Sequence, residues 1–240
     1  MKYHIEKNSV QETLIIPLYA RKMCSEQYPD LYRDETAIRL LDAIDYDFST
    51  LAKKSGSSMQ RFGFLEVAMR QSDLACEVRD YLKTHPNAAV VNLGCDLNDT
   101  AWFREIDASG GAVFFAAGVF YYFLTPQVRA LVCAMAEAFP GGKLVFDAAN
   151  RKAVKLMLKT WIKDAEIKDV GAYFAVSDAQ RELAPWSPKL RVSSRGYMLG
   201  YHDLNDPSVS GFFRFLAKVG DGMMDMQIVR IDFAGEKSGA

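Results

Sequence analysis

The chain has 240 residues, 50% of them hydrophobic, which is enough for one sizeable core. Its 29 basic and 30 acidic residues give a formal net charge of -1, so no basic field would attract nucleic acid. The four cysteines are scattered, with no paired or histidine-associated motif, which predicts reduced thiols and no metal site. No run approaches the roughly 20 apolar residues of a membrane span, and no targeting segment begins the chain. We therefore expect a cytoplasmic protein without nucleic-acid or membrane partners.

The amino-terminal segment predicts short helices. Ser9–Glu26 carries apolar residues at near-helical spacing, and Pro17 within it predicts a break or a helix that begins near Ile16. Thr36–Ile44 predicts a second helix with Asp34 as its N-cap.

The longest helical pattern, Phe62–Thr84, ends before the first buried apolar run. About 85 residues of mostly helix thus precede any strand. We expect a single domain over 1–240, with a helical cap over 1–86 and an α/β core over 87–240.

The predicted core begins with two short apolar runs, Ala88–Leu93 and Ala112–Ala117, typical of strands buried on both faces. Thr125-Pro126 predicts an N-cap and first helical residue, and the helix continues to about Phe139. Lys143–Asp147 predicts a third buried strand. A strand–helix–strand unit of this length favours a parallel sheet. The predicted fold class is therefore α/β, a Rossmann-like and mostly parallel sheet flanked by helices.

The carboxyl-terminal third has a less regular pattern over Asp164–Ser194. Ala153–Trp161 and Gly211–Lys218 predict helices, while Gly196–Tyr201 and Gln227–Phe233 predict strands.

Ligands of open α/β sheets bind at the carboxyl ends of the strands. Gly94–Asn98 and Ala116–Tyr122 follow two predicted strands there, and their glycines allow a close approach to a ligand. The aromatic run Phe120–Phe123 predicts either core packing or contact with a substrate. Asp96 and Asp99 either cap a helix that begins near there or face polar groups of a ligand.

Arg70 lies on the longest predicted helix, whose polar face is marked by Asp73 and Arg79. It is either solvated or turned toward the sheet, where its planar fork would suit a carboxylate.

No dinucleotide glycine fingerprint occurs, and no acidic residue ends a second strand about 20 positions on, which disfavours an NAD-type oxidoreductase on this sheet. No P-loop and no serine or cysteine nucleophile motif occurs either. The three histidines, His4, His85 and His202, are therefore predicted to be surface or structural residues.

Several segments together resemble the leucine carboxyl methyltransferase and polyketide O-methyltransferase family, in the class I group that depends on S-adenosylmethionine. They are Ile-Pro-Leu-Tyr-Ala-Arg (16–21), Ile-Asp-Tyr-Asp-Phe (44–48), Ala-Met-Arg (68–70), Val-Val-Asn-Leu-Gly-Cys (90–95), Phe115–Phe123 and Phe-Pro-Gly-Gly-Lys-Leu-Val-Phe-Asp (139–147). Together they belong mostly to the first 150 residues, and the carboxyl-terminal third fits more loosely. The resemblance implies methyl transfer to an oxygen of a small-molecule hydroxyl or carboxylate.

The resemblance also implies site residues. Arg70 would hold the methionine carboxylate of S-adenosylmethionine, and Gly94 would lie under the methionine moiety. Tyr121 or Tyr122 would lie near the substrate. Apart from the resemblance, the amino-terminal helices and the Trp186 region predict either an apolar lid suited to an aromatic or polyketide-like molecule or part of the core. The cofactor-binding residues implied are Arg70, Gly94, Asp96, Leu97, Ala116, Ala117 and Gly118, and the substrate-binding residues are Tyr121, Tyr122 and Trp186; no catalytic residue is implied.

The chain departs from the family after Gly94. There the family continues into a second strand that ends in an acidic residue holding the ribose, whereas here Cys95 leads directly to Asp96 and Leu97. The resemblance thus implies that several tens of residues are missing, which would leave a smaller sheet with a new edge open to self-association. Ala117 stands where many relatives carry glutamate. The alternative is therefore a non-catalytic relative that acts as a binding or oligomer-forming module.

Overall fold

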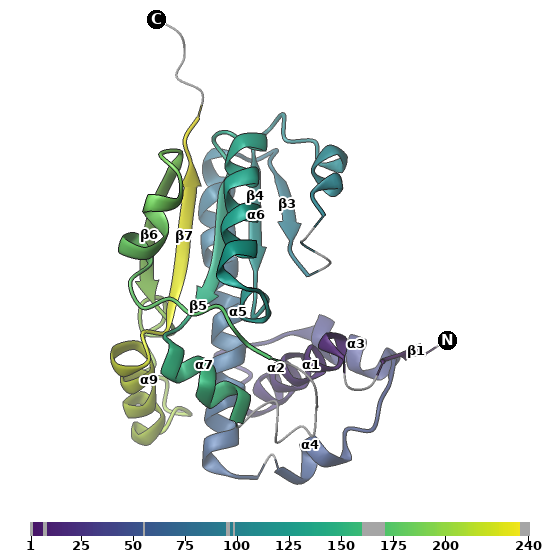
Figure 1. Ribbon diagram of the computed structural model, residues 1–240. Helices are drawn as coiled ribbons and strands as arrows, with labels where there is room; N and C mark the ends of the chain where they lie inside the picture. Colours follow the sequence, from purple (N-terminus) through teal and green to yellow (C-terminus); the bar gives the residue numbers. More distant parts are fainter. Residues whose placement is uncertain are drawn as a thin grey trace, which may run out of the picture.

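The computed structural model describes residues 2–6, 9–54, 56–94, 97, 99–159 and 171–235. Its centre is a five-stranded sheet of order β3-β4-β5-β7-β6 (Figure 1). The strands β3, β4 and β5 are parallel, and β7 is antiparallel to both of its neighbours, so four of the five strands share a direction. The predicted α/β class with a mostly parallel sheet is confirmed. The strand bounds are Ala89–Asn92 (β3), Ala112–Ala116 (β4), Lys143–Ala148 (β5), Leu190–Gly196 (β6) and Gln227–Phe233 (β7).

Helices cover both faces of this sheet. One apolar layer lies between the sheet and α5 and α9, and the other lies between the sheet and α6 and α8. The α-helices are Val10–Thr13 (α1), Ile15–Gln27 (α2), Glu35–Ala43 (α3), Ser49–Lys54 (α4), Ser58–Thr84 (α5), Thr125–Ala138 (α6), Arg151–Met157 (α7), Ala179–Leu183 (α8) and Gly211–Met223 (α9). Shorter elements are the 3-10 helices Ala101–Glu105, Phe120–Tyr122 and Ala184–Trp186, and the paired strands Tyr3–His4 (β1) and Ile44–Asp45 (β2).

Alternation along the strands separates the two apolar layers. Phe114 of β4 points into the α6 layer, whereas its neighbour Val113 points into the α5 layer. Both side chains are fully buried, and burying one of this size stabilises the fold by roughly 1.5–3 kcal/mol. The longest helix, α5, packs directly on β4 and β5 as well as on α2, so it joins the amino-terminal helices to the sheet.

The amino-terminal predictions are confirmed in their main points. Pro17 lies in the first turn of α2, which begins at Ile15, where a missing N–H costs no helical hydrogen bond. The Asp34 carboxylate accepts a hydrogen bond from the Ala37 N–H and caps α3. The long helix begins at Ser58, earlier than its apolar pattern indicates, because the Ser57 hydroxyl caps it.

The predicted strand Gly196–Tyr201 is wrong. The strand β6 ends at Gly196, and the chain then turns because Met198 adopts a left-handed φ of 54° that a strand cannot contain. The aromatic run after β4 forms the 3-10 helix Phe120–Tyr122 rather than a strand end. The N-cap of α6 is Leu124 and not Thr125, since the Gln127 side chain satisfies the Leu124 N–H.

Two further predictions concern residues that follow β3 and α7. Asp99 accepts a hydrogen bond from the Ala101 N–H, which supports the capping interpretation for that residue. Cys95, Asp96 and Asn98 lie outside the described residues, as does the end of the helix predicted over Ala153–Trp161.

The strand β3 forms one edge of the sheet in the described part of the chain. Ala89 and Leu93 donate their N–H groups toward β4, so the N–H and C=O groups of the alternate residues, such as Val90, point away from the sheet. The Val90 side chain is 48% exposed.

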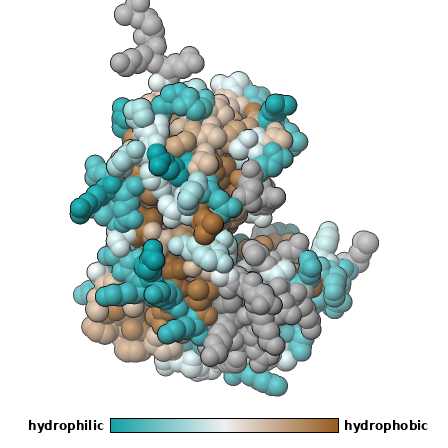
Figure 2. Space-filling model, viewed as in Figure 1, coloured by the Kyte–Doolittle hydropathy of each residue, from teal (hydrophilic) through white to brown (hydrophobic). Residues whose placement is uncertain are grey.

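Large apolar side chains are also exposed on α9, which shows as hydrophobic colouring at the lower left of Figure 2. They are Phe212, Phe215 and Met223. Among the described helices, none is long and apolar enough to cross a membrane.

Candidate functional site

The parallel strands bring three segments to one edge of the sheet. Asn92 of β3 is paired with Phe115 of β4, and Ala116 is paired with Phe146 of β5. Gly94, Ala117 and Asp147 therefore follow at the same carboxyl-terminal edge, where open α/β sheets bind ligands.

Arg70 reaches this edge from α5. Its Nη1 lies 3.2 Å from Oδ2 of Asp147, and the two side chains are only 12% and 2% exposed. The other carboxylate oxygen, Oδ1, accepts a hydrogen bond of 2.6 Å from the Gly118 N–H. One buried carboxylate thus ties together α5, β5 and the turn after β4.

Gly118 is required at this turn for two reasons. Its φ is +70°, a left-handed conformation that side chains rarely adopt, and a Cβ atom would lie 3.1 Å from Nη1 of Arg70. The backbone and the guanidinium can approach each other this closely only because the residue is glycine.

A second carboxyl group, Glu66, lies one helical turn before Arg70. Burial raises the pKa of Glu66 to about 7, against the opposing effect of Arg70, and Asp147 adds to the rise. Burial alone would lower the pKa of Arg70, but Asp147 and the other nearby groups outweigh it, so the guanidinium stays charged.

Two buried phenols complete the cluster. Burial raises the pKa of Tyr121 and of Tyr197 well above the usual value, so both hydroxyls stay neutral and can donate hydrogen bonds. Asp147 reinforces both shifts, while Arg70 opposes them.

Arg70 keeps one donor unused. Its Nε is buried and has no hydrogen-bond partner among the described residues. Leaving such a group unpaired costs roughly 1–3 kcal/mol, a cost that a ligand carboxylate would remove by accepting from Nε. The site therefore suits a ligand with a carboxylate.

The other predicted cofactor residues have different surroundings. Gly94 is exposed, with open space over its Cα. Leu97 is buried and borders a pocket of about 310 Å³ on the α6 side, which Thr100, Phe120, Phe123, Gln127, Val128, Ala130, Leu131 and Ala134 also line. Ala116 is buried in the α6 layer, and Ala117 is partly buried on the α5 face.

The predicted substrate residues separate into two groups. Tyr121 lies with Arg70 and Asp147, and the Tyr122 side chain shares a hydrogen bond with Thr13 of α1, which links this edge to the amino-terminal helices. Trp186 does not join them. Its ring packs on the α6 face against Phe174, at 6.4 Å between centroids.

Sequence reasoning missed Asp147, Glu66 and Tyr197 as members of the site. Asp147 had a usable signal, because an acidic residue at the end of a buried apolar strand needs a partner. Asp73, expected on the polar face of α5, is fully buried.

Comparison with known proteins gives one partial sequence match and a matching fold. A stretch of 102 residues is 32% identical to the tetracenomycin polyketide synthesis O-methyltransferase TcmP of Streptomyces glaucescens, and covers 42% of this chain and 36% of TcmP. Over this stretch the chain is similar to an O-methyltransferase. The match spans little more than a third of TcmP, and no family model matches the chain.

The fold has counterparts among solved structures. A DUF574 family protein from Streptomyces avermitilis superposes with a TM-score of 0.51 at 9% identity, over 76% of this chain and 90% of that one. At this identity the match shows a shared fold only. A putative methyltransferase from Thermobifida fusca gives a TM-score of 0.43 at 11% identity, over 92% and 94% of the two chains.

Proposed function

We propose that the protein is an S-adenosylmethionine-dependent O-methyltransferase that acts on a hydroxyl or carboxylate of a small molecule. The observation that carries the proposal is Arg70, a buried cation with a spare Nε donor at the carboxyl edge of the sheet. The partial similarity to TcmP supports the same reading.

In this proposal the chain binds, orients and shields the reactants. Arg70 holds the methionine carboxylate of the cofactor, and Gly94 and Gly118 let the backbone approach it. Ala117 and Leu97 border the cofactor, together with Ala116 from beneath. Asp96 stays a proposed contact, although it lies outside the described residues. The bound cofactor supplies a methyl group made electrophilic by its sulfonium, so alignment and exclusion of water are the protein's main tasks.

The acceptor would enter beside the aromatic residues after β4. Tyr121 lies at the Arg70 cluster, and Tyr122 contacts Thr13 of α1, so the amino-terminal helices would cover the acceptor. Trp186, on the α6 face, would contribute only to a distal part of the acceptor pocket.

The first test is calorimetric titration with S-adenosylmethionine and S-adenosylhomocysteine. We expect binding in the micromolar range, and binding about tenfold weaker in Arg70→Lys, which keeps the charge but not the fork. Arg79→Lys is the matched control, since Arg79 is exposed on the same helix, and should change affinity by less than about twofold. Equal affinities in the two variants would remove Arg70 from the site.

The second candidate is a non-catalytic binding or oligomer-forming module. It is favoured by the Arg70–Asp147 pair, because the guanidinium already has a carboxylate partner without any ligand. A cooperatively melting protein that binds neither compound at about millimolar concentration would establish this alternative over the enzyme.

A further inference from the structure

The helix α5 carries buried charges beyond Arg70. Asp73, one turn further along, is 0% exposed, and Glu77, one turn after that, is 3% exposed. Apolar residues of similar volume would hold a helix on a sheet at least as well as buried ion pairs do. These carboxylates therefore call for an explanation other than stability.

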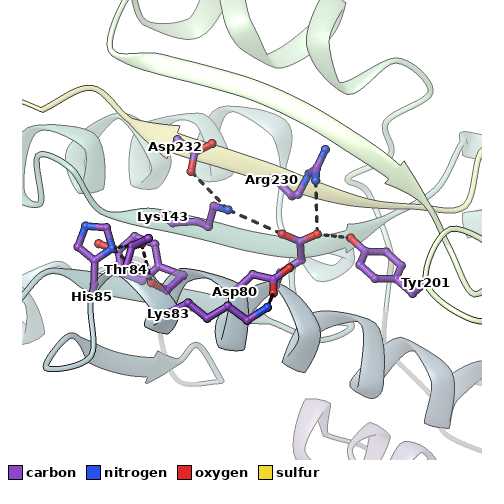
Figure 3. Close-up of polar contacts among 10 residues, drawn as sticks. Asp80, Lys83, Thr84, His85, Lys143, Tyr201, Arg230 and Asp232 are labelled. Carbon is purple, nitrogen blue, oxygen red and sulfur yellow. Dashed lines mark hydrogen bonds and ion pairs between the residues drawn. The ribbon is translucent and has the colours of Figure 1, made fainter.

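Glu77 links α5 to the strands β5 and β7 and to the turn after β6. The Tyr201 hydroxyl donates a hydrogen bond of 2.6 Å to its Oε1. Lys143 Nζ and Arg230 Nη1 lie 3.7 Å and 3.5 Å from its carboxylate. Figure 3 shows Tyr201, Lys143 and Arg230 converging on this point from three different segments.

Asp73 holds the same turn at two other points. Its Oδ2 accepts a hydrogen bond of 2.9 Å from the Met198 N–H. Its Oδ1 lies 2.6 Å from Nε2 of His202. One carboxylate therefore contacts both ends of the segment from Met198 to His202, by a hydrogen bond at Met198 and by a close approach at His202.

The backbone of this turn is strained. Met198 has a φ of 54°, which costs about 1 kcal/mol or more for a residue that is not glycine. Its N–H donates to Asp73, and its C=O accepts from the N–H groups of Tyr201 and His202, so these contacts together hold it in this conformation. Strain of this kind persists only where the surroundings over-determine it, and it concentrates at functional sites.

The turn places Tyr197 at the candidate site. Tyr197 directly precedes Met198 and is buried in the apolar layer of α5 with Leu65, Ala68 and Met69, the neighbours of Arg70. Arg70 opposes the rise in the pKa of Tyr197 that burial causes, which agrees with this placement beside the neighbours of Arg70.

We propose that Asp73 is a positioning residue, which holds Met198 and His202 so that Tyr197 faces the ligand bound at Arg70. The inference rests on the proposed function, because the ligand is taken to be the methyl-donor cofactor. Asp73 itself touches no ligand and acts through the turn.

The test compares Asp73→Ala with Glu77→Ala. Both changes remove a buried carboxylate on the same face of α5 and loosen the same turn, but only the first removes the side-chain acceptor of the Met198 N–H. We expect Asp73→Ala to weaken S-adenosylhomocysteine binding about tenfold, and Glu77→Ala less than about threefold at a similar loss of melting temperature. Since His202 is partly exposed, His202→Ala gives a second, milder release of the turn and should weaken binding about fivefold.

Two further measurements distinguish a positioning role of Asp73 from a general loosening of the turn after β6. In the double variant that combines Asp73→Ala with Tyr197→Phe, the loss of binding free energy should be smaller than the sum of the two single losses. Both changes act through the Tyr197 hydroxyl. Hydrogen exchange at the amides of Tyr197 and Met198 should accelerate about tenfold in Asp73→Ala and stay within about threefold in Glu77→Ala.

Equal loss of affinity in the two carboxylate variants, or additive losses in the double variant, would overturn the positioning role. If the unaltered protein binds no S-adenosylhomocysteine, the proposed function falls and the ligand part of this inference falls with it. Amide exchange then decides the structural part alone, and unchanged exchange in Asp73→Ala overturns that part too.

Discussion

At the scale of single residues, the candidate site has one guanidinium group and two carboxyl groups. Arg70 is a single buried cation facing Asp147, with Glu66 one turn away as a second carboxyl group. Because burial raises the pKa of Glu66 to about 7, the site can take up a proton near neutral pH without breaking the Arg70–Asp147 pair.

Glu66→Gln should stabilise the protein above pH 7. The pKa of Glu66 rises on folding from 4.5 to about 7, so its ionisation opposes folding, and the opposition grows as pH rises between these two values. The variant avoids this cost and should gain about 3 kcal/mol at pH 8 but almost nothing near pH 4.5. Denaturant unfolding of the variant and of the unaltered protein at pH 8 and pH 4.5 measures this difference in the free energy of unfolding.

Glu105→Gln serves as the control for this prediction, because Glu105 is exposed on the 3-10 helix after β3. It should shift stability by less than about 0.5 kcal/mol at either pH. A gap between Glu66→Gln and the unaltered protein that does not change with pH would contradict the assignment.

The members of the site differed in how far the sequence could predict them. Arg70 and Gly118 were predictable because the family resemblance implied both of them. Arg70 lies on the helix before the first strand of the sheet, and Gly118 lies in the turn after the second. Tyr197 could not be predicted, since it lies more than 100 residues from Arg70 in sequence and only the sheet topology brings the two together.

At the scale of elements, the Asp34 side chain links α2 to α3. Asp34 caps α3 and also accepts two hydrogen bonds from Arg21 of α2, at 2.8 Å and 2.6 Å, and one from Tyr32. Burial alone would raise the pKa of Asp34, but these hydrogen bonds outweigh it and hold the pKa below 3.8.

Asp34→Asn should therefore destabilise the protein by about 1–2 kcal/mol at pH 7, since asparagine keeps the cap but loses the charge partner of Arg21. A lowered pKa gives stability that is present above about pH 4 and disappears as the pH falls through the pKa of the folded state. The difference between variant and unaltered protein should thus shrink below pH 4 in urea melts.

The exposed pair Arg33–Glu35 offers a comparison beside this one. Glu35→Gln should cost less than about 0.5 kcal/mol at any pH, because both side chains are solvated. A pH-independent loss of stability in Asp34→Asn would contradict the ion pair with Arg21 as the source of the effect.

The helix α5 explains where pattern reading fails. Asp73 and Glu77 are polar residues at helical spacing, which is the usual sign of a solvated face, yet both are buried. Their partners, such as Met198 and Tyr201, come from a turn far away in sequence, so no local pattern could reveal the burial. The apolar strands β4 and β5 were predictable because burial on both faces leaves a continuous apolar run. The expectation of burial on both faces was wrong for β3, an edge strand whose alternate residues Val90 and Asn92 are exposed.

At the scale of the whole molecule, β3 is an edge strand of the sheet that the described residues form. Outward N–H and C=O groups beside a half-exposed Val90 can pair with a strand of another copy.

Val90→Lys should reduce self-association, because a charged side chain on an edge strand opposes pairing between sheets. We expect at least about fivefold less dimer or larger species at roughly 1 mM protein by light scattering after gel filtration, with little loss of stability. Leu124→Lys is the control, since Leu124 is similarly exposed but lies before α6 and away from the edge. Equal association of the two variants would place the contact elsewhere.

The strand order also dictates when the protein can finish folding during its synthesis. The strands β3, β4 and β5 emerge in the order in which they lie side by side, so this half can assemble as it is made. In contrast, β6 has β7 as its described neighbour and must wait some 30 residues for it. The turn that carries Tyr197 follows β6 directly. Arg70 and Gly118 are therefore synthesised early, yet the turn that carries Tyr197 can join them only after β6 has paired with β7, so ligand binding at this site would report that the whole chain has folded.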